Sequence, residues 1–142
     1  MRYTTRLLAL TLLLSVTGIT AAQAELAVIA HPGTAAAGVA PDELARIYLG
    51  KTGTLGGERV TPVDQAEGTP ARMKFYHQVV GMDARELKSY WSKLMFTGKG
   101  KPPQSLANGR AVREWVAAHP GSLGYVEGSH VDGSIKVLLI LP

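Results

Sequence analysis

Hydrophobic and polar residues follow one another along the chain in patterns that predict short strands and amphipathic helices. The continuous apolar run Leu26–Ala30 is closed by the turn residues His31-Pro32-Gly33 and predicts a buried strand. A helix is predicted from Pro41, which suits a first helical position, to Gly50, which suits a helix end. The apolar side of that helix consists of Leu44, Ile47 and Tyr48.

The central part of the chain predicts a strand that leads into a second helix. Residues 53–57 have the composition of a turn, and residues 59–64 are predicted to be extended. Thr69 is placed to be the N-cap of a helix with Pro70 at its first position. Its apolar residues, up to the break at Gly81, are Met73, Tyr76, Val79 and Val80.

A third helix has the clearest amphipathic pattern in the chain. Asp83 and Glu86 have the spacing of a capping box, with Asp83 as the cap. The apolar stripe behind them consists of Leu87, Tyr90, Trp91, Leu94 and Met95. Met73, Met82 and Met95 are interpreted as residues that fill gaps in the core.

The last third of the chain predicts a loop, one more helix and two strands. Residues 96–103 form the loop, and Asn108 can cap the helix. Strands are predicted at 123–126 and 135–141. This order of elements favours an α/β fold with one sheet flanked by helices. The apolar residues of the helix are Val112, Trp115 and Val116.

Residues 1–24 differ in composition from the remainder and predict a signal peptide. Arg2 and Arg6 precede a short apolar run that starts at Leu7, and Ala22-Gln23-Ala24 has the form of a cleavage site. A retained membrane anchor is the alternative, but Thr11, Ser15, Thr17, Gly18 and Thr20 interrupt the run before the ~20 residues that a spanning helix needs. Cleavage would leave residues 25–142 as one exported domain, expected in the periplasm.

Composition and charge narrow the functional classes. The 142 residues include no Cys, so thiol chemistry and disulfides are excluded. Without Arg2 and Arg6, Lys and Arg fall from 15 to 13 against 11 Asp and Glu, a net charge of +2. The cations are dispersed along the sequence, so no nucleic-acid partner is expected.

No assembled catalytic or metal-binding motif is visible. Gly50-Lys51-Thr52 resembles the end of a phosphate-binding P-loop, but Ala45 stands where that motif needs Gly. The four His residues lack the spacing of paired metal ligands, and no Ser lies in a nucleophile turn. We therefore expect a protein that is not an enzyme and has neither a metal nor another cofactor.

The segment Glu67–Arg72 is the strongest candidate for a binding site. A helix that starts near Thr69 would present free N–H groups and a partial positive charge to an anion. Gly68 would allow close approach of the backbone, and Arg72 could add a forked contact. The same residues could equally serve only to cap the helix, and the Glu67 side chain could fold onto the helix start and occupy the position of the anion.

Four segments resemble the phosphate-binding proteins of ABC transporters. The run from Asp42 to Lys51 resembles the "Leu-x-x-Ile-Phe-x-Gly-Lys" helix end of that family, and Glu67–Phe75 falls at its "Ser-Gly-Thr-x-x-x-Phe". The other two segments resemble "Tyr-Trp … Phe-Thr-Gly-Lys-Gly" and "Pro-Gly-x-Ile-Gly-Tyr-Val"; they are Tyr90–Gly100 and Pro120–Val126. The order of the four segments matches over Leu26–Ile140.

The resemblance implies a single lobe of a type II periplasmic-binding-protein-like fold, with one mixed sheet. It implies a module that binds phosphate or a similar inorganic oxyanion in connection with ABC-type phosphate uptake, with the transporter's membrane components as partners. The expected ligand-binding residues are Gly68, Thr69 and Arg72, joined by His31 and Thr34 from the loop after the first strand. The alternative is a lobe that lost its ligand and serves protein–protein interaction, with a homodimer or an exposed apolar patch as its sign.

Overall fold

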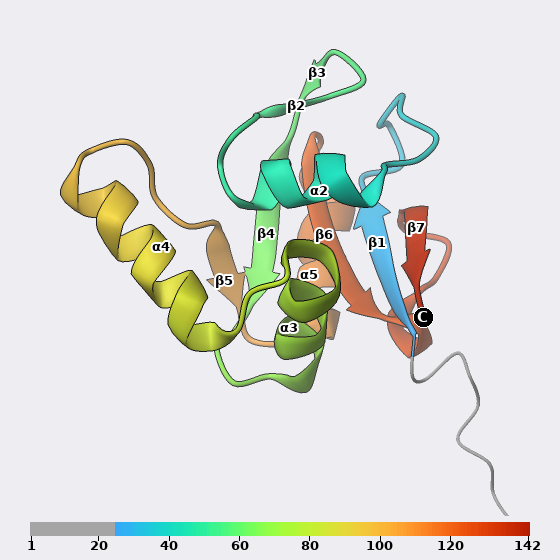
Figure 1. Ribbon diagram of the computed structural model, residues 1–142. Coiled ribbons are helices and arrows are strands. Elements are labelled where there is room, and N and C mark those ends of the chain that lie inside the picture. Colours follow the sequence, from blue (N-terminus) through green and yellow to red (C-terminus); the bar gives the residue numbers. More distant parts are fainter. Residues whose placement is uncertain (1–24) are drawn as a thin grey trace, which may run out of the picture.

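A five-stranded mixed sheet forms the centre of the computed structural model, which describes residues 25–142 (Figure 1). The strand order is β5-β4-β6-β1-β7, in which β4 runs parallel to β5 and β6, and β1 runs antiparallel to β6 and β7. The predicted signal peptide lies outside the described residues. The strands are β1 (Leu26–Ala30), β4 (Thr61–Gln65), β5 (Gln104–Leu106), β6 (Ser122–Glu127) and β7 (Lys136–Leu141).

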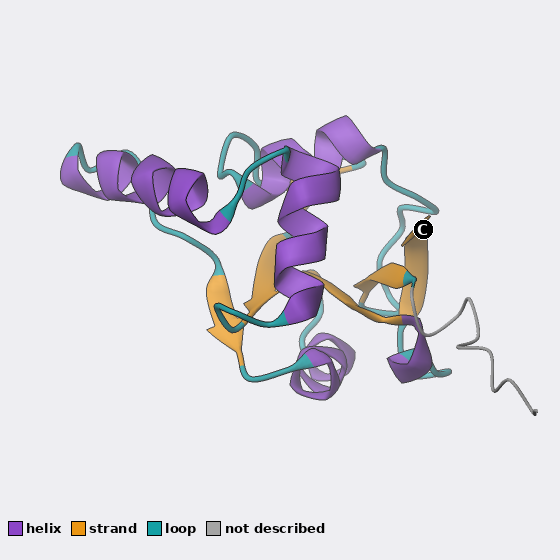
Figure 2. Ribbon diagram, turned by 60° about the horizontal axis from the view of Figure 1, so that its bottom comes forward, coloured by secondary structure: helices purple, strands orange, loops and turns teal. Residues whose placement is uncertain are grey.

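Helices cover both faces of the sheet (Figure 2). On one face lie α2 (Pro41–Tyr48), α3 (Pro70–Phe75) and the π-helical turn η1 (Tyr76–Val80), and α4 (Ala84–Phe96) extends sideways from them. The other face is covered by α5 (Gly109–Ala118), and the 3₁₀ turn η2 (Gly128–His130) follows β6. Successive β1 side chains alternate between the two cores, Val28 toward α2 and Ile29 toward α5.

The mixed α/β architecture and the principal helices confirm the sequence predictions. Leu44, Ile47 and Tyr48 of α2 are buried as expected. The side chain of Asp83 accepts a hydrogen bond from the Glu86 N–H at 2.9 Å and caps α4. Asn108 caps α5 in the same way through the Ala111 N–H. These caps satisfy backbone donors that a helix start leaves free.

The structure also contains elements that the sequence pattern did not predict. A hairpin of β2 (Thr54–Leu55) and β3 (Glu58–Arg59) occupies the region interpreted as a turn, with positive φ at Gly56 and Gly57. The loop before α5 contains the short strand β5. The helix predicted to continue to Gly81 changes to π geometry after Phe75.

The interpretation of the methionines as core residues is wrong for two of the three. The side chains of Met73 on α3 and Met95 on α4 are 56% and 52% exposed, and Met82 is half-buried. The residues that α3 and η1 bury are Ala71, Phe75 and Tyr76. Met73 lies two residues before the buried Phe75, about 200° away around the α-helix, so burial of Phe75 turns Met73 outward.

Candidate functional site

A buried carboxylate lies at the carboxyl end of β4. The Asp64 residue is 1% exposed and accepts hydrogen bonds from the Tyr76 hydroxyl at 2.5 Å and from the Tyr125 hydroxyl. The Gln65 N–H donates to the same carboxylate at 2.8 Å. A buried charge is tolerated only where such donors replace water. Asp64 is therefore the centre of a polar network inside an otherwise apolar core.

The surrounding elements hold the two phenols in place. In η1, the Gly81 N–H donates to the Tyr76 carbonyl at 2.7 Å, and this π-helical turn carries the Tyr76 side chain to Asp64. Tyr125 comes from β6, the neighbour of β4, and its ring stacks on Phe75 with a centroid distance of 4.0 Å. Single π turns in helices frequently occur at functional sites.

Burial controls the ionisation of the tyrosines. It raises the pKa of Tyr76 and of Tyr125 well above 10.0, and the negative charge of Asp64 raises both further. The pKa of Tyr48, whose hydroxyl donates to the Val63 carbonyl at 2.9 Å, is raised by the same two causes in the same order. All three phenols therefore stay protonated and remain hydrogen-bond donors at neutral pH.

Arg72 connects this buried network to the surface. Its Nη1 donates to the Gln65 carbonyl at 2.9 Å and to the Ser105 hydroxyl at 3.2 Å, and it lies 3.6 Å from the Asp64 carboxylate. The guanidinium also lies 5.5 Å from the centroid of the Tyr76 ring. The Arg72 side chain is 15% exposed. Within residues 25–142, its Nη2 and Nε have no hydrogen-bond partner.

The Gly68-Thr69 turn is partly occupied by the chain itself. Gly68 has φ +83°, which favours glycine because a Cβ would be strained there. The Thr69 N–H and hydroxyl both donate to the Ala66 carbonyl, at 3.3 and 2.8 Å. Thr69 is thus the N-cap residue of α3, as predicted, but its side chain does not cap the helix. Its amide is not available to a ligand in this conformation.

The structure separates the predicted site residues into two groups. β4 and β6 run parallel, and their first residues, Thr61 and Ser122, pair with each other. β1 runs antiparallel to β6, so the end of β1 lies beside the start of β6, where the His31 N–H donates to the Ser122 carbonyl at 3.4 Å. His31 and Thr34 therefore lie at the end of the sheet where β4 begins. Gly68, Thr69 and Arg72 follow the end of β4, so the expected single seat is not formed.

The loop that carries His31 and Thr34 is held by contacts of its own. His31 Nδ1 accepts a hydrogen bond from the Gly33 N–H at 3.0 Å, and the Thr34 carbonyl accepts one from Lys136 Nζ at 2.9 Å. This loop borders a cavity of about 390 Å³ together with Glu58 and Arg59 of the hairpin. It contributes nothing to the surroundings of Arg72.

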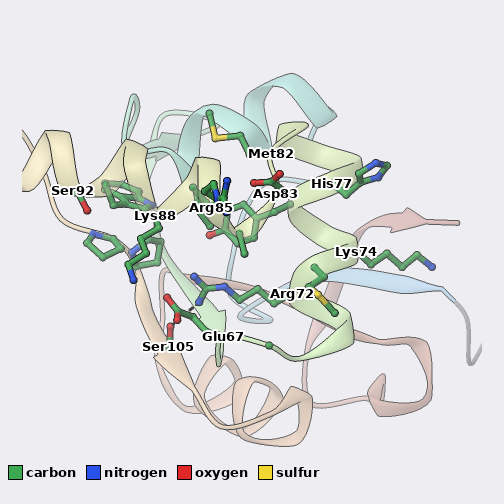
Figure 3. Close-up of a pocket in the computed structure, with 18 of the residues that line it drawn as sticks. Glu67, Arg72, Lys74, His77, Met82, Asp83, Arg85, Lys88, Ser92 and Ser105 are labelled. Carbon is green, nitrogen blue, oxygen red and sulfur yellow. Dashed lines mark hydrogen bonds between the residues drawn. The ribbon is translucent and has the colours of Figure 1, made fainter.

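Arg72 lines a larger cavity of about 1040 Å³ between α3, η1, α4 and the segment before β5 (Figure 3). Gly68, Glu67 and Ser105 line the same cavity, and in Figure 3 the Glu67 side chain extends toward Arg72 and Ser105. The ion pair of Arg72 is with Asp64, and Glu67 is exposed. Glu67 thus borders the candidate seat.

Sequence reasoning missed several residues of this site. No role in the site is predicted for Asp64, Tyr76, Tyr125 or Ser105. One signal was available, because Arg72 and Tyr76 are four residues apart and share a helix face. Ser105 carries no such signal, because it is 33 residues away from Arg72 and meets it only through β4–β5 pairing.

Among the residues that the structure describes, no group of three His, Asp or Glu side chains is placed to hold a metal ion. In the same part of the chain, no helix has both the length and the apolar character to cross a membrane.

Solved structures share this fold. The chain matches a protein described as a phosphate ABC transporter substrate-binding protein from Clostridium perfringens, with bound phosphate, at 22% identity and TM-score 0.61. It also matches an ABC-type phosphate transport receptor from Vibrio cholerae (18%, 0.64) and PstS from Borrelia burgdorferi (13%, 0.60). Each match covers 80% of this chain, and no family model and no curated protein sequence matches it significantly.

The chain spans less than half the length of the proteins that it matches, between 43% and 46% of them. The likeness shows the fold of one lobe of a periplasmic binding protein: a mixed sheet with helices on both faces.

Proposed function

We propose that this chain is an exported, single-lobe binding module that holds phosphate or a similar oxyanion in connection with an ABC-type phosphate transporter. It would act in the periplasm, after removal of residues 1–24. The proposal describes a binding protein without catalysis, in line with the binding proteins whose fold it shares.

The observation that carries the proposal is the orientation and hydrogen bonding of the Arg72 guanidinium. Its Nη1 is fixed by Gln65, Ser105 and Asp64, so the planar guanidinium is oriented before any ligand arrives. Its Nη2 and Nε keep donors for an anion, and forked contacts of this kind suit phosphate oxygens. The Ser105 hydroxyl and the Gly68 backbone are the other groups of the proposed seat. The fold is shared with a protein crystallised with phosphate.

The carboxylates near Arg72 lower the affinity that we expect for an anion at the proposed seat. Asp64 already supplies one negative charge to Arg72, and the exposed Glu67 adds another at the cavity edge. Both carboxylates repel a phosphate. We therefore expect weak binding, and we exclude His31 and Thr34 from the seat because they lie at the other end of the sheet.

A nitrogen-15 NMR titration of residues 25–142 with phosphate tests both the existence and the place of the seat. We expect saturable shifts of the Gly68 and Ser105 amides and of Arg72 Nε, and none at the amides of His31 and Thr34. Sulfate serves as a second tetrahedral anion. Absence of saturable shifts at Gly68 and Arg72 up to the millimolar range would contradict the proposal.

A second candidate function is protein–protein interaction. The observation that favours it is the exposed apolar end of α4, where Met95 is 52% and Phe96 is 94% exposed on a helix that extends away from the sheet. Light scattering on residues 25–142 addresses self-association. A concentration-dependent mass that disappears in Phe96→Ser would favour this function, and a constant monomer mass would count against self-association.

A further inference from the structure

The cavity beside Arg72 is larger and more apolar than an inorganic oxyanion requires. Its volume of about 1040 Å³ lies at the upper end of the range typical of sites for small organic molecules, roughly 300–1,000 Å³. A single phosphate ion would fill only the end that Arg72, Gly68 and Ser105 form. The apolar part of the lining includes Met73, Met82, Leu87, Trp91, Met95 and Pro102.

The exposed methionines lie on two different elements that border this cavity. Met73 projects from α3 and Met95 from α4, and each keeps more than half of its surface accessible. Methionine is flexible and polarisable and adapts to ligands of varied shape. Apolar surface that stays exposed beside a fixed cation indicates a ligand with both apolar and charged parts.

The charges that line the cavity require that ligand to be an anion. Arg72 lies among the residues that form the seat, and Arg85 and Lys88 of α4 line the cavity as well. Of the two acidic residues in the lining, Asp83 is occupied as the cap of α4, and Glu67 is exposed at the seat. Basic side chains outnumber acidic ones in the lining, which favours an anion over a neutral apolar molecule.

We infer that the cavity takes a phosphate monoester with an apolar body, such as an alkyl or aryl phosphate, with the phosphate at Arg72 and the body along Met73 and Met95. The inference rests on the proposed function, because it uses the same seat for the phosphate. It adds the class of ligand, namely a soluble organophosphate that binds more tightly than free phosphate. The cavity provides both the apolar wall and the cationic end that such a molecule needs.

Calorimetric titration of residues 25–142 with n-octyl phosphate, inorganic phosphate and n-octyl glucoside tests this inference. We expect n-octyl phosphate, kept below its micelle concentration, to bind at least about tenfold more tightly than phosphate, because its chain buries apolar surface of the cavity. The glucoside has the same chain without the anion and is expected to bind more weakly than n-octyl phosphate. Vesicles that contain phosphatidic acid test whether a lipid surface is the source of the phosphate.

Variants separate the two ends of the site. In Met73→Gln and Met95→Gln, the affinity ratio of n-octyl phosphate to phosphate is expected to fall toward one. The matched control is Ile140→Gln, an exposed apolar residue of β7 outside this cavity, which should keep the ratio. In Arg72→Gln both ligands should bind more weakly, with circular dichroism as the check on folding.

The outcomes distinguish this inference from the proposed function. If phosphate binds and n-octyl phosphate binds no more tightly, the organophosphate inference is wrong and the proposed function stands. If neither binds, the proposed function fails and the inference fails with it. Equal affinity for n-octyl glucoside, or binding to vesicles alone, would also overturn the inference. Binding of n-octyl phosphate that depends on both Arg72 and the methionines supports it.

Discussion

At the scale of single residues, the buried Asp64 determines what the site can do. Its carboxylate accepts from two phenols and a backbone N–H, and it pairs with Arg72. This ion pair fixes the orientation of the guanidinium, and the Asp64 carboxylate also neutralises part of its positive charge. In the proposed seat, a phosphate would meet a cation that is oriented in advance and partly neutralised, which favours reversible, weak binding over tight capture.

The buried phenols predict a loss of stability in alkaline solution. The pKa values of Tyr48, Tyr76 and Tyr125 are raised in the folded state, whereas an unfolded tyrosine titrates near 10.0. The folded chain therefore holds protons that the unfolded chain releases, so the stabilisation is complete below pH 10 and declines as pH rises further. Three such groups make the free energy of unfolding fall by about 4 kcal/mol per pH unit above pH 10.

Urea unfolding measured at a series of pH values checks this slope. In Tyr76→Phe the slope should fall by about a third, because one of the three groups is removed. Tyrosinate absorbance should develop together with unfolding for these residues. Ionisation of all three phenols near pH 10 in a protein that stays folded would contradict the account.

Removal of the Asp64 carboxylate should destabilise the fold strongly. Asp64→Ala leaves two phenols without their acceptor and removes the anion that pairs with Arg72, so we expect the free energy of unfolding to fall by about 3–5 kcal/mol. The matched control is Glu67→Ala, an exposed carboxylate three residues away, with a change within about 0.5 kcal/mol. Chemical denaturation of both variants measures the difference. Similar values for the two would show that the buried network contributes little.

At the scale of elements, local signals predicted the helices well. Asp83 and Asn108 were recognised as caps from the sequence alone, because capping depends on residues three apart. The π turn was not predicted, because an apolar repeat does not distinguish a helix that closes its hydrogen bonds over five residues. That turn carries the Tyr76 side chain to Asp64, a contact that the apolar repeat does not predict.

The contact between α5 and β6 depends on the absence of a side chain at Gly124. A Cβ at this position would lie 2.5 Å from Val112 Cγ1 and 3.3 Å from Val116 Cγ2. We expect Gly124→Ala to lower the free energy of unfolding by about 1–3 kcal/mol through overpacking. Thermal or urea unfolding measures this change.

A matched control and a rescue variant make this prediction specific. Gly133→Ala adds a methyl group where no atom lies within 4 Å, so it should change stability by less than about 0.5 kcal/mol. Adding Val112→Ala to Gly124→Ala should recover part of the loss, because it removes the atom that clashes. Equal stabilities of Gly124→Ala and the natural chain would refute the close packing of α5 on β6.

At the scale of the whole molecule, the sheet topology decides which candidate residues can act together. The sequence predicted four of the five strands of the main sheet but not their directions, because pairing joins residues as distant as Leu26 and Leu141. The antiparallel placement of β1 moved His31 and Thr34 away from Arg72, whereas parallel β4–β5 pairing brought Ser105 to it. The structure thus brings Gly68 and Arg72 to one cavity and leaves His31 and Thr34 at the other end of the sheet, and binding of an anion at this segment stays a prediction.

The size of the molecule sets the final question. In this chain α3, η1 and α4 line the cavity beside Arg72. Whether that arrangement holds an oxyanion is the central claim. Isothermal titration calorimetry of residues 25–142 with phosphate, on the natural chain and on Arg72→Gln, tests it most directly. Ser105→Ala is a second seat variant, and Arg110→Gln on the exposed surface of α5 is the control.

We predict saturable heat for the natural chain and for Arg110→Gln, with affinity at least about tenfold weaker in Arg72→Gln because charge-assisted hydrogen bonds are lost. Ser105→Ala should weaken binding to a smaller extent. No saturable heat up to the millimolar range, or equal affinity in the natural chain and Arg72→Gln, would contradict the claim that Arg72 holds an oxyanion.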